Sequence, residues 1–227
     1  MTNISRTTLR ELKKRYLNIL KKCFLANLMA FGMVTLSTPA MAGEDRLENY
    51  DDKTYTSAVT FEDIEYNDYG GAIYNEGTIT FGGDTTFTGN SAGIGGAIAN
   101  TGTITFGGDA TFTGNSATGD YALGGAIFNY GTITFGGDTT FTGNSAGIGG
   151  TIANTGTITF GESSSVSFSN NTANGQLNDI YNEGGTINIL GEVKSDIHLE
   201  SFGGTIGLKA KDTDGDGKVT YGGSYKL

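Results

Sequence analysis

The chain has 227 residues, of which 38 are glycine, one is cysteine and one is proline. Seven of its 14 basic residues precede Gly43 but only one of its 24 acidic residues does, so the chain from Gly43 onward carries seven basic against 23 acidic side chains. This excess of negative charge makes nucleic acid a poor partner, and a single cysteine cannot form a disulfide within the chain.

The first 42 residues have the order of an export signal. Residues 1–22 hold seven basic side chains, residues 23–36 form an uncharged stretch of 14 residues, and Ala40-Met41-Ala42 provides a small-x-small cleavage sequence. A membrane anchor is the alternative, but the stretch falls short of the ~20 apolar residues that span a bilayer. We therefore predict a signal helix in residues 1–42, cleaved after Ala42, and export of the remainder.

From Gly70 onward, the sequence repeats at nearly regular intervals. Gly-Gly-Ala-Ile begins at Gly70, Gly95 and Gly124, and Gly-Gly-Thr-Ile begins at Gly149, at steps of 25, 29 and 25 residues. Within the copies, Gly-Thr-Ile-Thr-Phe recurs at residues 77–81, 102–106, 131–135 and 156–160, and Phe-Thr-Gly-Asn recurs at 87–90, 112–115 and 141–144. Self-similarity at a fixed period of this length is typical of stacked-repeat folds.

Each copy contains three short alternating runs, separated by Gly, Asn and Asp, which indicate strands and turns. Three short strands per coil of about 25 residues predict an all-β parallel β-helix, in which strands of successive coils pair. A sandwich or barrel would also show short strands, but near-identical copies favour stacking of like on like. We place the β-helix in residues 59–208, an acidic arm or cap in 43–58 and a polar tail in 209–227.

Alternation also assigns directions to the side chains of a coil. It directs Ile79 and Phe81 inward, together with Ile73 and Phe87, and the threonines outward. The glycine pairs are predicted turns, because glycine accepts positive φ and lets coils approach. The asparagine of Phe-Thr-Gly-Asn lies off the inward alternation, and its copies are expected to stack as an amide ladder at a corner. These turn and ladder residues are Gly70, Gly71, Gly95, Gly96, Gly124, Gly125, Gly149, Gly150, Asn90, Asn115 and Asn144.

One corner carries insertions. Residues 91–94 of one copy correspond to the longer segment 116–123 of the next, and a second expansion covers residues 172–177. Solenoids usually place their binding residues in loops that emerge on one side. We therefore expect binding through this corner, near residues 120–123.

Gly-Gly-Ala-Ile alternating with Phe-x-x-Asn, from Gly70 to Asn182, resembles the polymorphic outer-membrane proteins first described from chlamydiae. The resemblance implies a right-handed parallel β-helix of the autotransporter passenger type, displayed on a Gram-negative cell surface and used in adhesion. It also implies a host or neighbouring cell-surface glycan or protein as partner. Family members end in a translocator β-barrel, whereas this chain ends in Tyr225-Lys226-Leu227, so outer-membrane attachment is expected only through a translocator that this chain does not contain.

Catalytic groups are scarce, and we expect no enzyme activity. Asp84, Asp109 and Asp138 each follow Gly-Gly and are expected about 5 Å apart on successive coils, close to the carboxylate spacing of retaining glycosidases. A polysaccharide-degrading β-helix enzyme is therefore an alternative, although a repeated, solvated turn aspartate produces the same pattern. Arg46 and His198 are the one arginine and the one histidine after Gly43, so a metal cluster or a serine–histidine pair lacks parts.

Calcium is the one cofactor that the sequence suggests. Residues 212–220 match the first nine positions of a calcium loop, but Gly223 stands where a bidentate glutamate is expected, so binding would be weak. A flexible acidic tail is the alternative interpretation. The candidate ligands are Asp212, Asp214, Asp216, Lys218 (through its carbonyl) and Thr220.

Outward threonines suggest a further alternative, a secreted ice-binding solenoid. In-register coils would arrange them as a flat two-column array, which resembles ice-binding faces of solenoids, although threonine is also a good exposed strand residue. The array consists of Thr78, Thr80, Thr103, Thr105, Thr132, Thr134, Thr157 and Thr159. The leading hypothesis remains a secreted or surface-displayed structural and adhesive protein.

Overall fold

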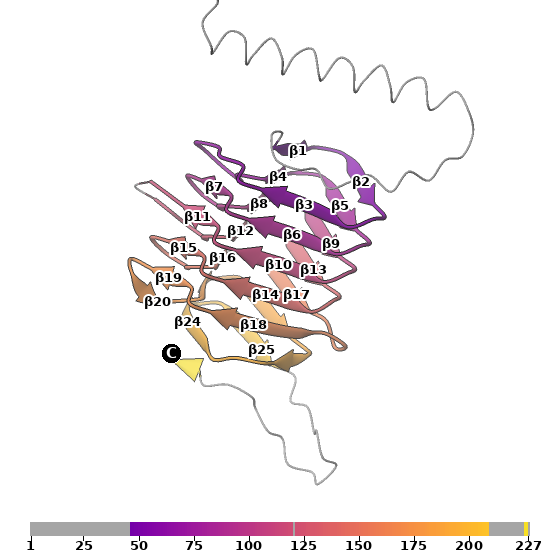
Figure 1. The fold of residues 1–227 in the computed structure, drawn as a ribbon. Helices are drawn as coiled ribbons and strands as arrows, with labels where there is room; N and C mark the ends of the chain where they lie inside the picture. Colours follow the sequence, from indigo (N-terminus) through magenta and orange to yellow (C-terminus); the bar gives the residue numbers. More distant parts are fainter. Residues whose placement is uncertain (1–45, 120, 209–224, 227) are drawn as a thin grey trace, which may run out of the picture. The chain divides into compact units, whose positions relative to one another are not determined.

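The computed structural model describes residues 46–119, 121–208 and 225–226. These residues form a parallel β-solenoid of about six turns, with roughly 26 residues per turn and no helix. The predicted all-β solenoid is therefore confirmed, and Figure 1 shows the strands of successive coils lying above one another. The predicted signal helix of residues 1–42 lies outside the described residues.

Strands of successive coils pair into four sheets, which we call A to D in the order in which a coil visits them. Sheet A contains β1 (Leu47–Asn49), β4 (Ile73–Asn75), β8 (Ile98–Asn100), β12 (Ile127–Asn129), β16 (Ile152–Asn154), β21 (Ile180–Glu183), β24 (Ile197–Phe202) and β26 (Tyr225–Lys226). Sheet B contains β2 (Asp52–Tyr55), β5 (Thr78–Phe81), β9 (Thr103–Phe106), β13 (Thr132–Phe135), β17 (Thr157–Phe160), β22 (Thr186–Ile189) and β25 (Thr205–Leu208).

Sheets C and D complete the coil. Sheet C contains β3 (Val59–Glu62), β6 (Thr85–Thr88), β10 (Ala110–Thr113), β14 (Thr139–Thr142), β18 (Ser165–Ser169) and β23 (Glu192–Val193). Sheet D contains β7 (Ser91–Ala92), β11 (Ser116–Ala117), β15 (Ser145–Ala146), β19 (Thr172–Ala173) and β20 (Gln176–Leu177). The sequence predicted three strands per coil; the fourth, in sheet D, has two residues, which is too short for alternation to reveal.

Equivalent residues of the copies are partners in the ladders. Thr78 pairs with Thr103, which pairs with Thr132, and the inserted residues of the 29-residue step lie between β11 and β12 without shifting any register. A shift by one residue would turn the inward side chains outward, so the buried side chains fix this register.

Aromatic and aliphatic side chains fill the lumen, as the alternation predicts. Ile73, Ile79, Phe81 and Phe87 are 0% exposed. The phenylalanines of sheet B stack at 4.9–5.2 Å between ring centroids, those of sheet C stack at 4.7–5.1 Å, and the two columns meet edge to face. These spacings match that of paired strands, so the ring columns and the backbone ladders reinforce each other.

A corner ladder of asparagines joins sheets C and D. Each side-chain amide donates to a phenylalanine carbonyl at 3.1–3.2 Å, and each except the last also donates to the Oδ1 atom of the next asparagine at 3.0 Å. All members are 0% exposed, so the ladder satisfies polar groups that water cannot reach. The corner ladder consists of Asn90, Asn115, Asn144 and Asn171.

A second ladder, which the sequence analysis did not identify, runs along the inner side of sheet A. Its amides are linked at 2.7–2.8 Å, and every member is 0% exposed. Its signal is the recurring Ile-x-Asn of β4, β8, β12 and β16. The sheet A ladder consists of Asn49, Asn75, Asn100, Asn129, Asn154 and Asn182.

The two glycines of each pair serve different purposes. Gly95 has φ +64°, a left-handed conformation that glycine adopts without strain. A Cβ atom on Gly96 would lie 2.1 Å from the carbonyl oxygen of Gly125 in the next coil, so this glycine is required by the close approach of the backbones. The equivalent pairs at residues 70–71, 124–125 and 149–150 repeat both features.

Part of the predicted acidic arm or cap belongs to the solenoid itself. β1 pairs with β4 and β2 pairs with β5, so residues 47–55 supply two strands of the first coil. Asn49 begins the sheet A ladder, and the ring of Tyr55 stacks on Phe81 at 5.2 Å. The strands are hard to recognise in the sequence because β2 presents charged and polar side chains instead of the repeated Thr-Ile-Thr-Phe.

Candidate functional site

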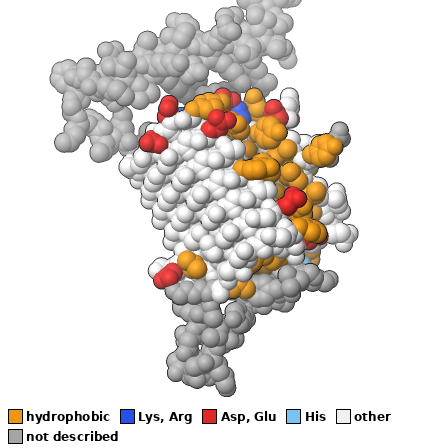
Figure 2. All heavy atoms as spheres, turned by 180° about the vertical axis from the view of Figure 1, so that it is seen from behind, with side chains coloured by type: hydrophobic (Ala, Val, Ile, Leu, Met, Phe, Trp, Pro, Cys, Tyr) orange, Lys and Arg blue, Asp and Glu red, His pale blue; other side chains and the backbone are white. Residues whose placement is uncertain are grey.

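The outer surfaces of the sheets differ in chemical character. The outward positions of sheets B and C are mostly threonine and serine, whereas aromatic side chains gather at sheet A and its flanking turns. Figure 2 shows the contrast as a broad face without hydrophobic or charged side chains beside a hydrophobic band with carboxylates at intervals. The band is the clearest candidate for a binding surface among the described residues.

Two outward columns form this surface. The first lies between the isoleucines and asparagines of sheet A and consists of Glu48, Tyr74, Ala99, Phe128, Ala153, Tyr181 and Glu200. The second lies two residues further along each coil and consists of Tyr50, Glu76, Thr101, Tyr130, Thr155, Glu183 and Phe202. We call the six aromatic residues of the two columns, Tyr50, Tyr74, Phe128, Tyr130, Tyr181 and Phe202, the aromatic face.

The first column alternates large and small side chains from coil to coil. Tyr74, Phe128 and Tyr181 lie on every second coil, with Ala99 and Ala153 between them. Both alanines are only 2% exposed although they point outward, so the larger neighbouring side chains cover them. The column is therefore a continuous apolar strip, and Phe128 extends it sideways by packing edge to face against Tyr130 at 5.2 Å.

Carboxylates border the strip toward both ends. The hydroxyl of Tyr74 donates to Glu76, and this hydrogen bond is the main reason why the pKa of Tyr74 rises to about 12. Burial raises the pKa of Tyr181, and the carboxylate of Glu183 adds to the effect. The strip therefore presents neutral phenols beside anionic groups at neutral pH.

Arg46 lies against this surface, with its guanidinium 5.3 Å from the ring centroid of Tyr74. It pairs with Glu48, donates to the carbonyl oxygens of Tyr69 and Gly70 at 2.7 Å, and lies 3.8 Å from the ring centroid of Tyr66. Arg46 thus places one positive charge, paired with Glu48, at the Tyr74 end of the strip, whereas Glu183 and Glu200 border its other end.

The predicted corner insertions border the aromatic face. Residues 116–123 run from sheet D to sheet A, and residues 172–177 include the antiparallel pair β19 and β20. Tyr121 is 81% exposed and Leu177 is 56% exposed. Asp120 lies outside the described residues.

The repeated aspartates Asp84, Asp109 and Asp138 hold turns together. The Oδ1 atom of Asp84 accepts the backbone N–H of Asp109 at 3.0 Å, and Asp109 and Asp138 accept from the following coil in the same way. The N–H of Ser165 is the main cause that lowers the pKa of Asp138, and Lys194, 3.6 Å away, contributes. Each carboxylate thus has a role in joining coils.

The eight predicted threonines lie in two columns on sheet B. Thr78, Thr103 and Thr132 are exposed, and the other five, Thr80, Thr105, Thr134, Thr157 and Thr159, are partly exposed. Sheet C carries a similar outward array that the sequence analysis did not single out, with Thr86, Thr88, Thr111, Thr113, Thr140 and Thr142. The solenoid therefore presents two adjacent hydroxyl-bearing faces.

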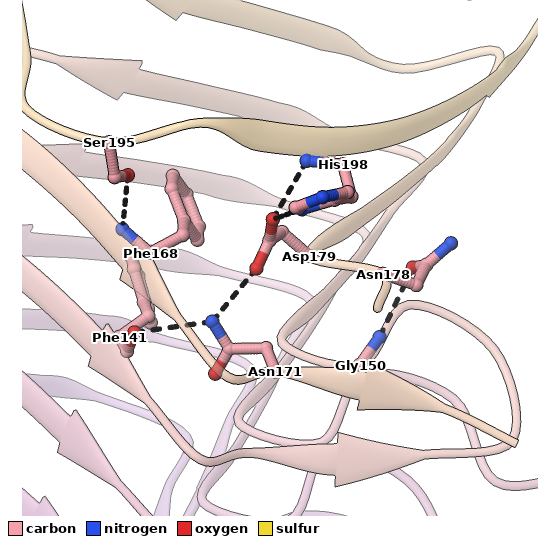
Figure 3. Close-up of polar contacts among 8 residues, drawn as sticks. All are labelled: Phe141, Gly150, Phe168, Asn171, Asn178, Asp179, Ser195 and His198. Atoms are coloured by element: carbon pink, nitrogen blue, oxygen red, sulfur yellow. Dashed lines mark hydrogen bonds and ion pairs between the residues drawn. The ribbon is translucent and has the colours of Figure 1, made fainter. Parts of the chain in front are cut away.

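A buried carboxylate terminates the corner ladder (Figure 3). Asp179 is 2% exposed, and it accepts hydrogen bonds from the amide of Asn171 at 2.9 Å and from the backbone N–H of His198 at 2.7 Å. The Nδ1 atom of His198 lies 3.0 Å from the same carboxylate. These partners satisfy the oxygens of the buried carboxyl group, and the cluster connects the last regular coil to β24.

The five candidate calcium ligands, residues 212–220, lie outside the described residues, and the described part of the chain contains no group of three or more His, Cys, Asp and Glu side chains that could hold a metal ion. No helix within residues 46–119, 121–208 and 225–226 is long and apolar enough to cross a membrane.

Comparison with known families supports the resemblance seen in the motifs. The model of the Chlamydia polymorphic membrane protein repeat matches residues 84–101 and 109–130. Each match contains one Phe-Thr-Gly-Asn and one Gly-Gly-Ala-Ile, so each covers consecutive strands of sheets C, D and A. No curated protein and no solved structure matches the chain significantly. Two segments of the β-solenoid thus match the repeat of this family, which fits a repetitive surface protein.

The aromatic face escaped the sequence analysis, although a signal was present. The residue between Ile and Asn in the Ile-x-Asn repeat is Tyr74, Ala99, Phe128, Ala153 and Tyr181 in turn. These residues are 25 to 29 positions apart, so their adjacency becomes visible only when the register is known.

Proposed function

We propose that this protein attaches a cell to a host or neighbouring surface, that it is displayed outside the cell, and that it does so without catalysis. The β-solenoid provides a rigid spacer, and the aromatic face with the adjoining corner insertions provides the binding surface. The supporting observation is the concentration of exposed aromatic side chains at sheet A, while sheets B and C present hydroxyl groups. Exposed apolar patches with polar rims mark interaction sites, and aromatic residues dominate binding energy there.

The order of the first 42 residues and the match to a family model support this proposal. The first 42 residues have the order of a signal peptide, and the matched repeats belong to a membrane-protein family of bacteria. The proposed centre of binding is sheet A. It lies beside the corner near residues 120–123, where the sequence predicted binding.

Adhesion of coated beads to cultured cells tests the proposal. Beads carrying the purified chain should adhere, and the double substitution Phe128→Ala with Tyr130→Ala should remove most of the adhesion, because both rings point outward. The matched control is Thr111→Ala with Thr113→Ala on the outer side of sheet C. Equal adhesion by both variants would overturn the proposal, and thermal melting curves would show that both remain folded.

The threonine arrays favour a second candidate function, binding to ice. Its supporting observation is the in-register pairing of the threonine columns on sheet B. It predicts thermal hysteresis in solutions of the purified chain, which replacement of Thr105 and Thr134 by tyrosine should abolish. Normal ice growth in the presence of the unmodified chain would eliminate this candidate.

A further inference from the structure

The outer strip of sheet A has a regular spacing. Paired strands lie about 4.8 Å apart, so Tyr74, Phe128 and Tyr181, which occupy every second coil, follow one another at about 9.6 Å. The covered alanines between them keep the strip free of polar groups. A ligand that contacts all three aromatic residues must therefore repeat its own apolar groups at about this interval.

A polyproline II helix has such a repeat. It contains three residues per turn and rises about 3.1 Å per residue, so one edge returns every ~9.3 Å. Two turns, or about six residues, span the distance from Tyr74 to Tyr181 within about 1 Å. Proline-rich segments in this conformation bind to aromatic surfaces in several domain types, and they lose little entropy because the conformation is preformed.

The charges bordering the strip restrict the ligand further. Glu76 adjoins Tyr74 at one end, Glu183 adjoins Tyr181 at the other, and Glu200 follows on the next coil. At the Tyr74 end, Arg46 is paired with Glu48 and bonded to backbone carbonyls, so acidic side chains still outnumber this cation along the strip. A cationic ligand is therefore favoured, whereas an anionic glycan or a second copy of this acidic chain would be repelled.

We propose that the aromatic face binds a proline-rich, positively charged polypeptide segment in the polyproline II conformation. Its prolines lie on Tyr74, Phe128 and Tyr181, and its basic side chains reach Glu76 and Glu183. This inference rests on the proposed attachment function and names the class of partner on the opposing surface.

Binding to synthetic peptides tests the inference. The probe is a labelled peptide of about twelve residues with proline at every third position and arginine at both ends. The first control peptide has the same composition with irregular proline spacing, and the second has glutamate in place of arginine. Fluorescence anisotropy with the full chain at low and high salt measures the affinities.

The probe should bind, and both control peptides should bind on the order of tenfold more weakly. Phe128→Ala should lower the affinity for the probe about tenfold or more, Phe128→Tyr should retain it, and Thr111→Ala should leave it unchanged. Glu76→Gln combined with Glu183→Gln should reduce the affinity about fivefold and remove most of its salt dependence.

Specific results would overturn the inference. Equal binding of the regular and irregular peptides, or binding that is insensitive to Phe128→Ala, would exclude the proposed register. Capture of the chain by neutral glycans on an array, without peptide binding, would identify a glycan-binding face instead. If bead adhesion depends on Phe128 but the peptide does not bind, the inference fails and the attachment function stands. If the peptide binds but bead adhesion does not depend on Phe128, the attachment function fails.

Discussion

The lumen and the outer side of sheet A are built by the same coils and follow opposite rules. Inside, the stacked phenylalanines and the two asparagine ladders repeat one residue type over successive coils, whereas the first inward position of sheet C varies among Val59, Thr85 and Ala110. Outside sheet A, the column alternates between aromatic residues and alanine. Identical stacking satisfies packing and hydrogen bonding, so variation in these stacks would cost stability. The outer column of sheet A takes no part in these stacks, so its aromatic side chains can serve binding without disturbing the interior.

Replacing a phenylalanine by alanine should destabilise the chain most when the ring lies inside the solenoid. Phe112→Ala removes a fully buried ring that stacks on Phe87 at 4.7 Å and on Phe141 at 4.9 Å. The resulting cavity should lower the free energy of unfolding by about 3–5 kcal/mol, as chemical denaturation would measure. Phe112→Leu, which fills part of the space, should lose less, and equal losses would argue against a packing origin.

Disruption of an amide ladder should have the next largest effect. Asn115 donates to the Phe87 carbonyl and to Asn144, and it accepts from the backbone and side chain of Asn90. Asn115→Ala leaves these buried groups without partners and should cost about 2–4 kcal/mol of unfolding free energy. The outward substitution Thr113→Ala in the same coil should change it by less than about 0.5 kcal/mol. Similar losses of unfolding free energy for the two variants would show that water satisfies the buried polar groups in place of Asn115.

On the outer face, loss of a phenylalanine should affect stability far less. Phe128 is partly exposed, and its ring lies edge to face against Tyr130 on the outer surface, so Phe128→Ala should lower the free energy of unfolding by about 1 kcal/mol or less. Denaturation curves of Phe112→Ala and Phe128→Ala, recorded together, test this difference. A loss at Phe128 as large as that at Phe112 would mean that the aromatic face serves the fold, and would weaken its assignment to binding.

The sequence alone is sufficient to predict the strands and inward positions that recur from coil to coil. Alternation identified Ile79 and Phe81 as inward residues, and both are fully buried. It was insufficient for short or irregular strands: Ser91–Ala92 of sheet D has two residues, and Asp52–Tyr55 of the first coil lacks the repeated motif. The aromatic face depends on contacts between residues 25 to 29 positions apart, which no local period reveals.

The smallest expected effect concerns the turn aspartates, which connect coils on the solvent side. Because Ser165 and Lys194 lower the pKa of Asp138 below its ordinary value of 3.8, its ionised form stabilises the folded chain. This contribution is present above about pH 4 and is lost as the pH falls through the lowered pKa. Asp138→Asn should therefore reduce the melting temperature slightly at neutral pH, and the difference should shrink as the pH falls through the lowered pKa. Lys194→Met should reproduce part of the difference in melting temperature, since Lys194 is the lesser of the two causes. A difference in melting temperature that persists at low pH would assign the effect to packing rather than to charge.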